Sequence, residues 1–298
     1  MRILVTGAAG FVGRQLVPRL RDQHDLRVLM HSRPRDFGPS VEAFKSDLID
    51  RASLEPALQD VDMVVHLAFI TGDRPNHGNL YERVNVDGTR NLLDSCRTAG
   101  VRRVLLLGGI NTHQAKPGSY LQGRWQAEQL LRKSGCQWSI IRPSVLFGPA
   151  APFFVILRQL VLEFPLIPLL GGGRTLFQPM HVDDLVECIC SVVNRISYDR
   201  HVWEVGGPEH LSFRQLVEMT ERQLGIHKPK VSVPMGIAAI QARLMQALPR
   251  PPLTPAIIDL LSEDNITSID SVAKNFGFEP RSLTAEMAAQ GRVVDQTK

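Results

Sequence analysis

Residues 3–13 read Ile3-Leu4-Val5-Thr6-Gly7-Ala8-Ala9-Gly10-Phe11-Val12-Gly13, and this stretch decides the fold. Its three leading apolar residues predict a buried strand of a parallel sheet. Glycines follow at positions 7, 10 and 13, and apolar residues then recur at helical spacing as far as Leu20. A strand, a glycine-rich turn and a helix in this order are typical of a dinucleotide-binding unit.

Each glycine has its own physical reason in such a unit. Gly7 allows the tight turn out of the strand, and Gly10 lets the backbone approach a pyrophosphate because no Cβ stands in the way. Gly13 lets the helix pack closely on the strand. The N–H groups at the helix start then face the phosphates. We assign cofactor contacts to Gly7, Ala9, Gly10, Phe11 and Val12, with a glycine-rich turn that holds no ligand as the alternative.

The rest of the chain extends this pattern. Its 298 residues, 44% of them apolar, can bury a large core. Strands are predicted at 2–6, 26–30, 61–67, 103–108 and 138–142, and helices at 11–21, 51–58, 78–99 and 119–134. This alternation predicts an α/β fold, a doubly wound parallel sheet of the Rossmann type. We expect a Rossmann domain over 1–150, to which 181–207 returns, and a smaller, mostly helical substrate lobe over 151–298, formed mostly by 151–180 and 208–298.

Composition restricts the partners. The 34 basic and 30 acidic residues give a net charge of +4, without a basic or aromatic stripe, so we expect an anionic small ligand and no nucleic acid. The four cysteines have neither disulfide nor zinc spacing, and no metal site is expected. Met1 directly precedes the first strand, which predicts a cytoplasmic protein. The apolar window 153–170 is interrupted by charges and prolines, so a spanning helix and membrane contact are not expected.

Cofactor choice depends on the end of the second predicted strand. NAD-preferring sites usually carry an acid there, which binds the ribose 2′-hydroxyl. Here the chain reads His31-Ser32-Arg33-Pro34-Arg35, without an acid. Arg33, helped by Arg35 or Arg14, could hold a 2′-phosphate instead, which favours NADP(H) over NAD(H). A solvated basic loop is the alternative.

Two further segments are candidate cofactor contacts. Asp47 and Leu48 follow a short apolar stretch, where the carboxylate could accept from the adenine amino group. Leu67 and Ala68 follow the next apolar segment and are small enough for the pyrophosphate and ribose to pass. His66, just before them, is either a strand-end histidine with satisfied hydrogen bonds or a direct contact.

Several motifs together resemble the extended and atypical short-chain dehydrogenases/reductases, the NAD-dependent epimerase/dehydratase-like proteins. In chain order they are Thr6-Gly-x-x-Gly-x-x-Gly13, Ser46-Asp47-Leu48, His66-Leu67-Ala68, Asn85-Val-Asp-Gly88-Thr89, Tyr120-x-x-x-Arg124, Arg142-Pro-Ser-x-x-x-Gly148-Pro149 and Gln178-Pro-x-His181-Val-Asp183-Asp184. The run Phe177–Asp184 and the turn Gly206-Gly207-Pro208 look most like the branch that includes the nucleotide-binding accessory subunit of respiratory complex I.

The resemblance implies a catalytic Tyr, a Lys four residues later that holds the nicotinamide ribose, and an upstream Ser or Thr. Four residues place Tyr and Lys on one helix face. This chain keeps Tyr120 but has Arg124 where the Lys belongs. The serine position reads Gly108-Gly109-Ile110-Asn111-Thr112, so Asn111 or Thr112 is the candidate for the substrate oxygen, and ordinary loop residues are the alternative.

Other cofactor contacts are implied by the same resemblance. Asn85 would be a polar residue inside a helix that supports the site, and Gly108 directly follows the strand Val104 to Leu107. Pro143, Ser144 and Val145 match the segment that passes the nicotinamide carboxamide. His181, Asp183 and Asp184 resemble an acidic helix start, for which an N-cap is the plain reading.

We therefore expect an NADP(H)-dependent oxidoreductase that reduces a ketone or aldehyde of a small or medium-sized organic substrate with an incomplete Ser-Tyr-Lys triad. The partner is a small-molecule carbonyl compound, and the chain would be a monomer or homodimer. A nucleotide-binding structural or regulatory subunit without catalysis is the alternative. A nucleotide-sugar epimerase or dehydratase is the third interpretation.

Overall fold

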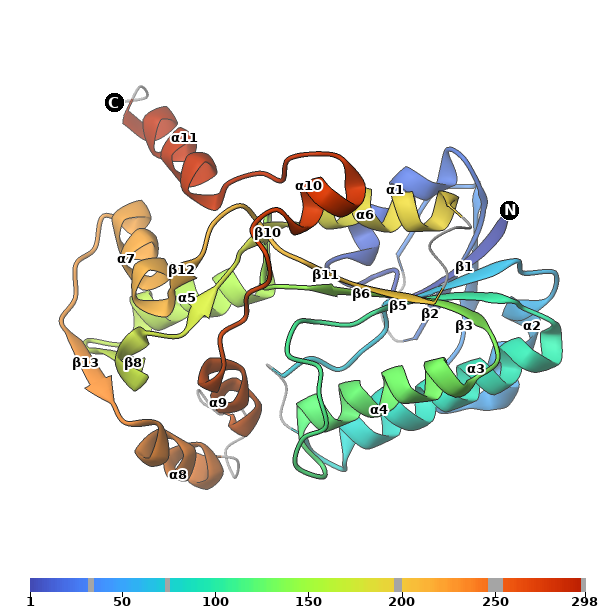
Figure 1. Cartoon of the computed structure of the whole chain (residues 1–298), viewed down its shortest axis with the longest axis horizontal. Helices are drawn as coiled ribbons and strands as arrows, with labels where there is room; N and C mark the ends of the chain where they lie inside the picture. The colour runs from blue at the N-terminus through green and yellow to red at the C-terminus, as the bar shows by residue number, and fades with distance from the viewer. Residues whose placement is uncertain (32–34, 73–75, 196–199, 246–253, 296–298) are drawn as a thin grey trace. The chain divides into compact units, whose positions relative to one another are not determined.

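The computed structural model describes residues 1–31, 35–72, 76–195, 200–245 and 254–295, so the predicted phosphate ligand Arg33 lies outside the described residues (Figure 1). The chain divides into two compact units. The first comprises Met1–Arg142 with Val186–Trp203, and the second comprises Pro143–Leu185 with Glu204–Lys298.

The first unit is built on a seven-stranded sheet. Its strands are β1 (Arg2–Thr6), β2 (Asp25–Met30), β3 (Val41–Lys45), β4 (Met63–His66), β5 (Arg103–Leu107), β6 (Gln137–Pro143) and β11 (His201–Val205). They lie in the order β11-β6-β5-β4-β1-β2-β3, and the five pairs from β3 to β6 are parallel. This confirms the predicted doubly wound parallel sheet. β3 was not among the predicted strands because three of its five side chains are exposed and it has no continuous apolar run.

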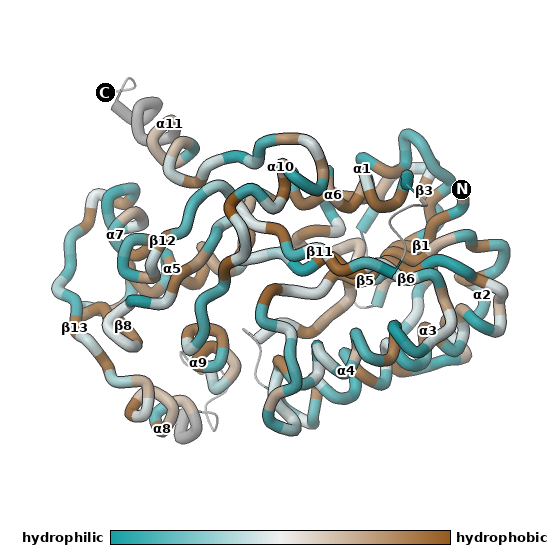
Figure 2. Tube along the Cα trace, viewed as in Figure 1, coloured by the Kyte–Doolittle hydropathy of each residue, from teal (hydrophilic) through white to brown (hydrophobic). Residues whose placement is uncertain are grey.

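Helices cover both faces of this sheet (Figure 1). On one face lie α1 (Gly13–Arg21) and the part of α6 (Val182–Asn194) that belongs to this unit; on the other lie α2 (Glu55–Leu58), α3 (Gly88–Ala99) and α4 (Tyr120–Lys133). Leu4, Val64, Leu92, Leu106 and Ile140 are buried in a core formed by the sheet and the second group of helices. Figure 2 shows hydrophobic residues along the central strands β1 and β5.

The helix predicted over 78–99 is not uniform. Residues Tyr81–Asp87 form a π-helical segment, η2, which continues directly into α3 at Gly88. Similarly, the predicted helix 51–58 is a 3₁₀ turn, η1 (Arg51–Leu54), followed by the single turn of α2. π-Helical segments are rare and often occur beside functional sites. Here the segment carries Asn85, whose place is described below.

The second unit combines helices with short strand pairs. Its helices are α5 (Pro152–Glu163), α7 (Phe213–Leu224), α8 (Met235–Met245), α9 (Pro255–Ser262), α10 (Ser271–Phe276) and α11 (Leu283–Asp295). The pairs are β7 (Leu146–Phe147) with β10 (Met180–His181), β8 (Ile167–Leu170) with β13 (Lys230–Val233), and β9 (Leu176–Phe177) with β12 (Leu211–Ser212). Ser212 and Gln215 form a capping box that fixes the start of α7. A core around Leu169, Phe177 and Leu216 holds these elements together.

Across the parts of the chain that the structure describes, none of the helices combines the length and apolarity needed to cross a bilayer.

Candidate cofactor and catalytic site

The strand order reverses at β1, which lies between β2 and β4, and ligands of doubly wound sheets bind at the carboxyl ends of strands at such a point. The glycine turn lies there. Gly7 has φ +71°, and a Cβ on it would stand 2.8 Å from the Ala68 nitrogen. A Cβ on Gly13 would stand 2.4 Å from the Gly7 oxygen. Any larger residue at either position would force the turn away from the strand ends.

The start of α1 can accept an anion. No side chain caps this helix, and its first turn contains no acidic residue. Within the described part of the chain, the amides of Phe11 and Val12 have no hydrogen-bond partner, and Gly10 is exposed. Unpaired N–H groups at the positive end of a helix bind phosphate well. The turn therefore fits the pyrophosphate of a dinucleotide.

A buried histidine connects the two strand ends. Thr6 Oγ1 accepts hydrogen bonds from the amides of Leu67 (3.2 Å) and Ala68 (3.3 Å). Its own proton is therefore directed to Nδ1 of His66, 2.7 Å away. Nε2 of His66 must then carry the ring proton, which it donates to Thr89 Oγ1 at 3.0 Å. His66 thus acts as a satisfied structural histidine, the first of the two interpretations of this residue.

The chain of hydrogen bonds continues into the π-helical segment. Thr89 Oγ1 donates to the backbone oxygen of Asn85 at 2.6 Å. The fully buried Asn85 side chain accepts from the Ile70 amide (2.7 Å) and donates to the Ile70 oxygen (3.0 Å). Asn85 therefore holds the loop after β4 through the backbone of Ile70.

Burial controls the protonation of His66. The ring is completely enclosed, and desolvation lowers its pKa from 6.5 to about 3. A proton on Nδ1 would also meet the hydroxyl of Thr6, whose oxygen is already engaged by two amides. The histidine is therefore neutral throughout the physiological range, and its tautomer is fixed.

The region after β2 brings a histidine and a carboxylate together. His31 Nε2 lies 3.1 Å from Asp47 Oδ2, and Oδ1 of the same carboxylate accepts from the Ile49 amide at 3.1 Å. Leu48 is buried beside this pair. Arg35 is exposed, with its guanidinium 5.7 Å from the centre of the Phe37 ring. Asp47 is therefore brought to the end of the strand where the adenine ribose is expected.

Tyr120 and Arg124 lie together at the start of α4. The Tyr120 ring is buried against Tyr81 in an edge-on contact, with centroids 5.6 Å apart. The Arg124 guanidinium carbon lies 5.3 Å from the centre of the Tyr120 ring. Neither the Tyr120 hydroxyl nor the Arg124 guanidinium has a hydrogen bond or ion pair with any residue that the structure describes. A hydroxyl and a half-buried cation that have neither hydrogen bond nor ion pair among the described residues, one helical turn apart, form a site that a ligand can complete.

The glycines at the serine position make room for Arg124. A Cβ on Gly109 would stand 1.9–2.4 Å from the guanidinium atoms of Arg124, so a larger residue there would displace the guanidinium from this position. Thr112, a candidate for the substrate oxygen, is buried and donates its hydroxyl to the Gly109 oxygen at 2.6 Å. Asn111 adopts a left-handed conformation, φ 65°. Thr112 therefore holds the loop, and Arg124 takes the space in front of it.

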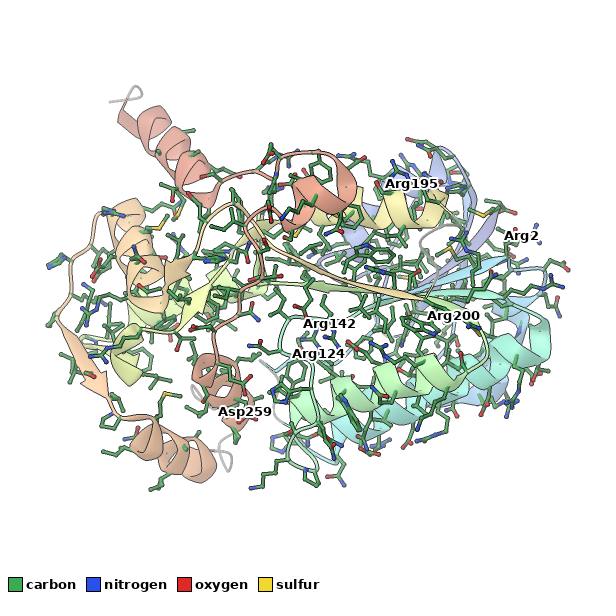
Figure 3. All side chains as sticks on the ribbon, in the orientation of Figure 1. Arg2, Arg124, Arg142, Arg195, Arg200 and Asp259 are labelled. Atoms are coloured by element: carbon green, nitrogen blue, oxygen red, sulfur yellow. The ribbon has the colours of Figure 1, made fainter. Side chains whose placement is uncertain are left out.

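A buried ion pair supports this arrangement from the next turn of α4. Glu128 is fully buried and binds Arg142 at the end of β6 through two hydrogen bonds of 3.0 and 2.7 Å. A Cβ on Gly108 would stand 2.8 Å from the Glu128 carboxylate. Figure 3 shows Arg124 and Arg142 close together between α4 and the sheet. The pair locks α4, β6 and the glycine loop in one geometry.

The predicted nicotinamide segment belongs to the second unit, where Pro143 is buried. Ser144 Oγ donates to the Asn265 oxygen atoms, both at 2.8 Å, and accepts from the Gln178 amide at 3.2 Å. The Val145 amide donates to Asn265 Oδ1 at 3.0 Å. The Ser144 hydroxyl is therefore used inside its own unit.

Sequence reasoning missed three of these features. Thr89 bonds to His66, 23 residues away, and Glu128 bonds to Arg142, 14 residues away. Gly109 leaves room for the side chain of Arg124. Two sequence signals could have indicated the contact between Gly109 and Arg124. They are the glycine pair at the serine position and the Arg in place of Lys. The described residues contain no cluster of three His, Cys, Asp or Glu side chains that could hold a metal.

Comparison with known proteins shows what the chain is similar to. Residues 7–152 match a family described as NAD(P)H-binding. An uncharacterised protein of Mycobacterium tuberculosis is 25% identical over 98% of this chain, and this chain spans 30% of that protein's length. The mouse sterol-4-alpha-carboxylate 3-dehydrogenase, decarboxylating, is 25% identical over 93% of this chain and 86% of its own. The Escherichia coli N-acetyl-alpha-D-glucosaminyl-diphospho-ditrans,octacis-undecaprenol 4-epimerase is 27% identical over 80% of this chain and 77% of its own.

Solved structures agree on the fold. A nucleoside-diphosphate-sugar epimerase from Staphylococcus aureus superposes with a TM-score of 0.77 at 15% identity, covering 96% of this chain and 99% of its own. A UDP-glucuronic acid 4-epimerase from Bacillus cereus, in complex with UDP-glucuronic acid and NAD, gives 0.73 at 20% identity over the whole of both chains. About half of the chain, residues 7–152, therefore matches the NAD(P)H-binding family, and the whole chain has the Rossmann-like fold of these epimerase structures.

Proposed function

We propose that this protein is an NADP(H)-dependent oxidoreductase that reduces a ketone or aldehyde by hydride transfer. The observation that carries the proposal is the pair formed by Tyr120 and Arg124, a hydroxyl and a guanidinium that lie one helical turn apart without partners in the described part of the chain. The relatives named above as a mouse 3-dehydrogenase and an Escherichia coli 4-epimerase support an oxidoreductase-type reaction.

In this reaction the cofactor supplies a hydride to the carbonyl carbon. Tyr120 donates its proton to the carbonyl oxygen, which becomes the hydroxyl of the product alcohol, and the tyrosine recovers a proton from solvent. Arg124 holds a positive charge beside the tyrosine ring, which stabilises the phenolate that remains. The fork of Arg124 lies in the space left by Gly109, so it can also donate to the substrate oxygen in place of the absent serine.

The preference for NADP(H) rests on the end of β2. Residues 31–35 contain no acid, and Asp47, which is brought to this strand end, is already engaged by His31. A 2′-phosphate there would meet basic residues, whereas a ribose 2′-hydroxyl would lack its usual free carboxylate. A fluorescence titration with NADPH and NADH tests this preference, and equal affinity for the two would contradict it.

The catalytic proposal is tested with Tyr120→Phe, using Tyr81→Phe as the matched control because the two rings touch. Transfer of deuterium from stereospecifically labelled NADPH to a panel of ketones and aldehydes is the readout. We expect Tyr120→Phe to lower kcat/KM by about 100-fold or more while NADPH affinity stays the same. Unchanged deuterium transfer in Tyr120→Phe would refute the assignment of the proton donor.

One observation favours a second candidate, a nucleotide-binding subunit without catalysis. The serine position is occupied by glycines, and an Arg replaces the usual Lys. This candidate would agree with the sequence likeness to the complex I branch, which rests on the motifs alone. It predicts tight cofactor binding without deuterium transfer to any carbonyl. A sugar-nucleotide epimerase is the third candidate, and it predicts interconversion of a sugar-nucleotide substrate without net oxidation of the cofactor.

A further inference from the structure

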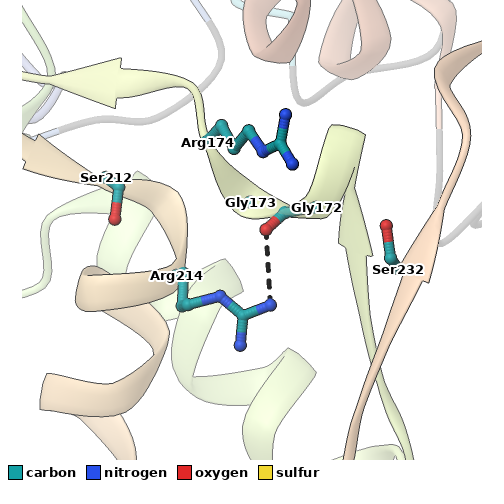
Figure 4. A pocket seen from close by; sticks show the side chains of 6 residues that line it. All are labelled: Gly172, Gly173, Arg174, Ser212, Arg214 and Ser232. Carbon is teal, nitrogen blue, oxygen red and sulfur yellow. Dashed lines mark hydrogen bonds between the residues drawn. The ribbon is translucent and has the colours of Figure 1, made fainter.

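A separate pocket lies entirely within the second unit. It encloses about 440 Å³ and is lined by Gly172, Gly173, Arg174, Ser212, Arg214 and Ser232. These residues come from the glycine turn η3 (Gly171–Gly173) with the residue after it, the start of α7, and β13. Figure 4 shows Arg174 and Arg214 on two sides of the glycine turn, with Ser232 nearby on β13. Small-molecule pockets have volumes of this order.

The pocket is positively charged, and its two arginines have few contacts with other residues that the structure describes. None of its six lining residues is acidic. Arg174 has no hydrogen bond or ion pair with any residue in the described ranges, and neither has the hydroxyl of Ser232. Arg214 is only loosely held, at 3.5 Å from the Gly172 oxygen and 4.0 Å from Glu218. Arg174 is therefore available to bind an anion, and only two long contacts of Arg214 compete with one.

The glycine turn keeps the space between these groups open. Gly172 has φ +74°, and a Cβ on it would stand 3.5 Å from the Ser232 hydroxyl and 3.8 Å from Arg174 Nε. A side chain there would project between the two donors. The start of α7, a helix of 12 residues, adds its positive dipole end from the side of Arg214.

We propose that this pocket binds the phosphoryl group of a small phosphate monoester. Guanidinium groups on two sides and a hydroxyl match an anion whose oxygen atoms point in several directions, as phosphoryl oxygens do. A carboxylate has its acceptor sites in one plane, so it matches donors that approach from several sides less well. The volume leaves room beyond the phosphoryl group for part of the ester. The inference is independent of the proposed reaction, since no residue of the first unit enters it.

The test is an NMR titration of the full chain that follows the backbone amides of Gly172 and Gly173. Inorganic phosphate, phenyl phosphate and benzoate are added separately at constant ionic strength, with NADPH present. Binding at the cofactor turn shifts Gly10 instead, so failure of the cofactor assignment is seen separately. We expect saturable shifts at Gly172 and Gly173 with both phosphates, and tighter binding of phenyl phosphate.

Variants locate the contact. Arg174→Ala and Arg214→Ala are each expected to raise the dissociation constant about tenfold, because each removes a charge-assisted hydrogen bond. Lysine at either position keeps the charge and should restore only part of the affinity. Arg222→Ala, an exposed arginine in the last turn of α7, is the matched control and should change nothing.

Three results would overturn the proposal. The first is the absence of saturable shifts at the two glycine amides with either phosphate. The second is an unchanged dissociation constant in a variant that lacks both Arg174 and Arg214. The third is binding of benzoate as tight as that of phenyl phosphate. If inorganic phosphate binds as tightly as the ester, the phosphoryl site stands and its ligand is the free ion.

Discussion

The buried His66 makes the stability of the first unit depend on pH in a calculable way. Its pKa falls from 6.5 in the unfolded chain to about 3 in the folded one, because the ring is completely enclosed. Between these values the unfolded state binds a proton that the folded state does not. The contribution of His66 to the free energy of unfolding is therefore fully present above pH 6.5, and it is lost as the pH falls toward 3.

The size of the effect follows from the two pKa values. Each unit of pKa difference corresponds to about 1.4 kcal/mol, and the free energy of unfolding should decrease by about 2 kcal/mol between pH 7.5 and pH 5 through this residue alone. That is a large part of the stability of an ordinary domain. Urea denaturation at a series of pH values, at constant ionic strength and followed by a probe in the first unit, measures it.

His66→Asn removes the titrating ring and keeps an acceptor for the Thr6 hydroxyl. We expect this variant to be less stable at pH 7.5 because it loses the bond to Thr89, but to lose most of the pH dependence. His24→Asn is the comparison, since burial also lowers the pKa of His24, although its ring is only partly enclosed. An equal slope in wild type and His66→Asn would refute the reasoning. So would ¹⁵N shifts showing that His66 carries its proton on Nδ1 at neutral pH.

Two further predictions concern the catalytic end of the first unit. Gly109→Ala places a Cβ on the guanidinium of Arg124, so it should lower turnover as much as Arg124→Ala does. The double variant should lose no more turnover than either single variant, and additive losses would contradict this. Glu128→Ala removes one partner of a largely buried ion pair and both of its hydrogen bonds to Arg142. It should cost about 3–5 kcal/mol of unfolding free energy, measured by urea denaturation. A loss below about 1 kcal/mol, the worth of an exposed pair, would mean that the ion pair is not buried as described.

Local sequence was enough for the parts of the fold that depend on neighbours along the chain. The strand, glycine turn and helix of 2–21 could be predicted because apolar periodicity and glycine spacing act within a few residues. The same reasoning missed β3, where exposed side chains hide the strand, and described 78–99 as one helix although η2 winds differently. These two departures depend on what packs against each segment.

The candidate site was predictable in its components but not in its contacts. Tyr120 and Arg124 were readable from their spacing of four residues. The placement of the Arg124 guanidinium beside Gly109 could not be predicted, because the two residues meet only when the loop after β5 folds against α4. The same holds for His66, whose hydrogen bonds reach 60 residues back to Thr6 and 23 forward to Thr89.

The sequence by itself therefore determined the doubly wound fold and the place of the dinucleotide turn, since both follow from short-range pattern and backbone sterics. Only the tertiary structure decided the tautomer of His66, the space for Arg124 and the pairing of Arg174 with Arg214 around one pocket. Each of these joins groups far apart in the chain, and their energies depend on burial and on distances of a few ångströms. Such distances are set when the elements pack, and no local pattern of residues encodes them.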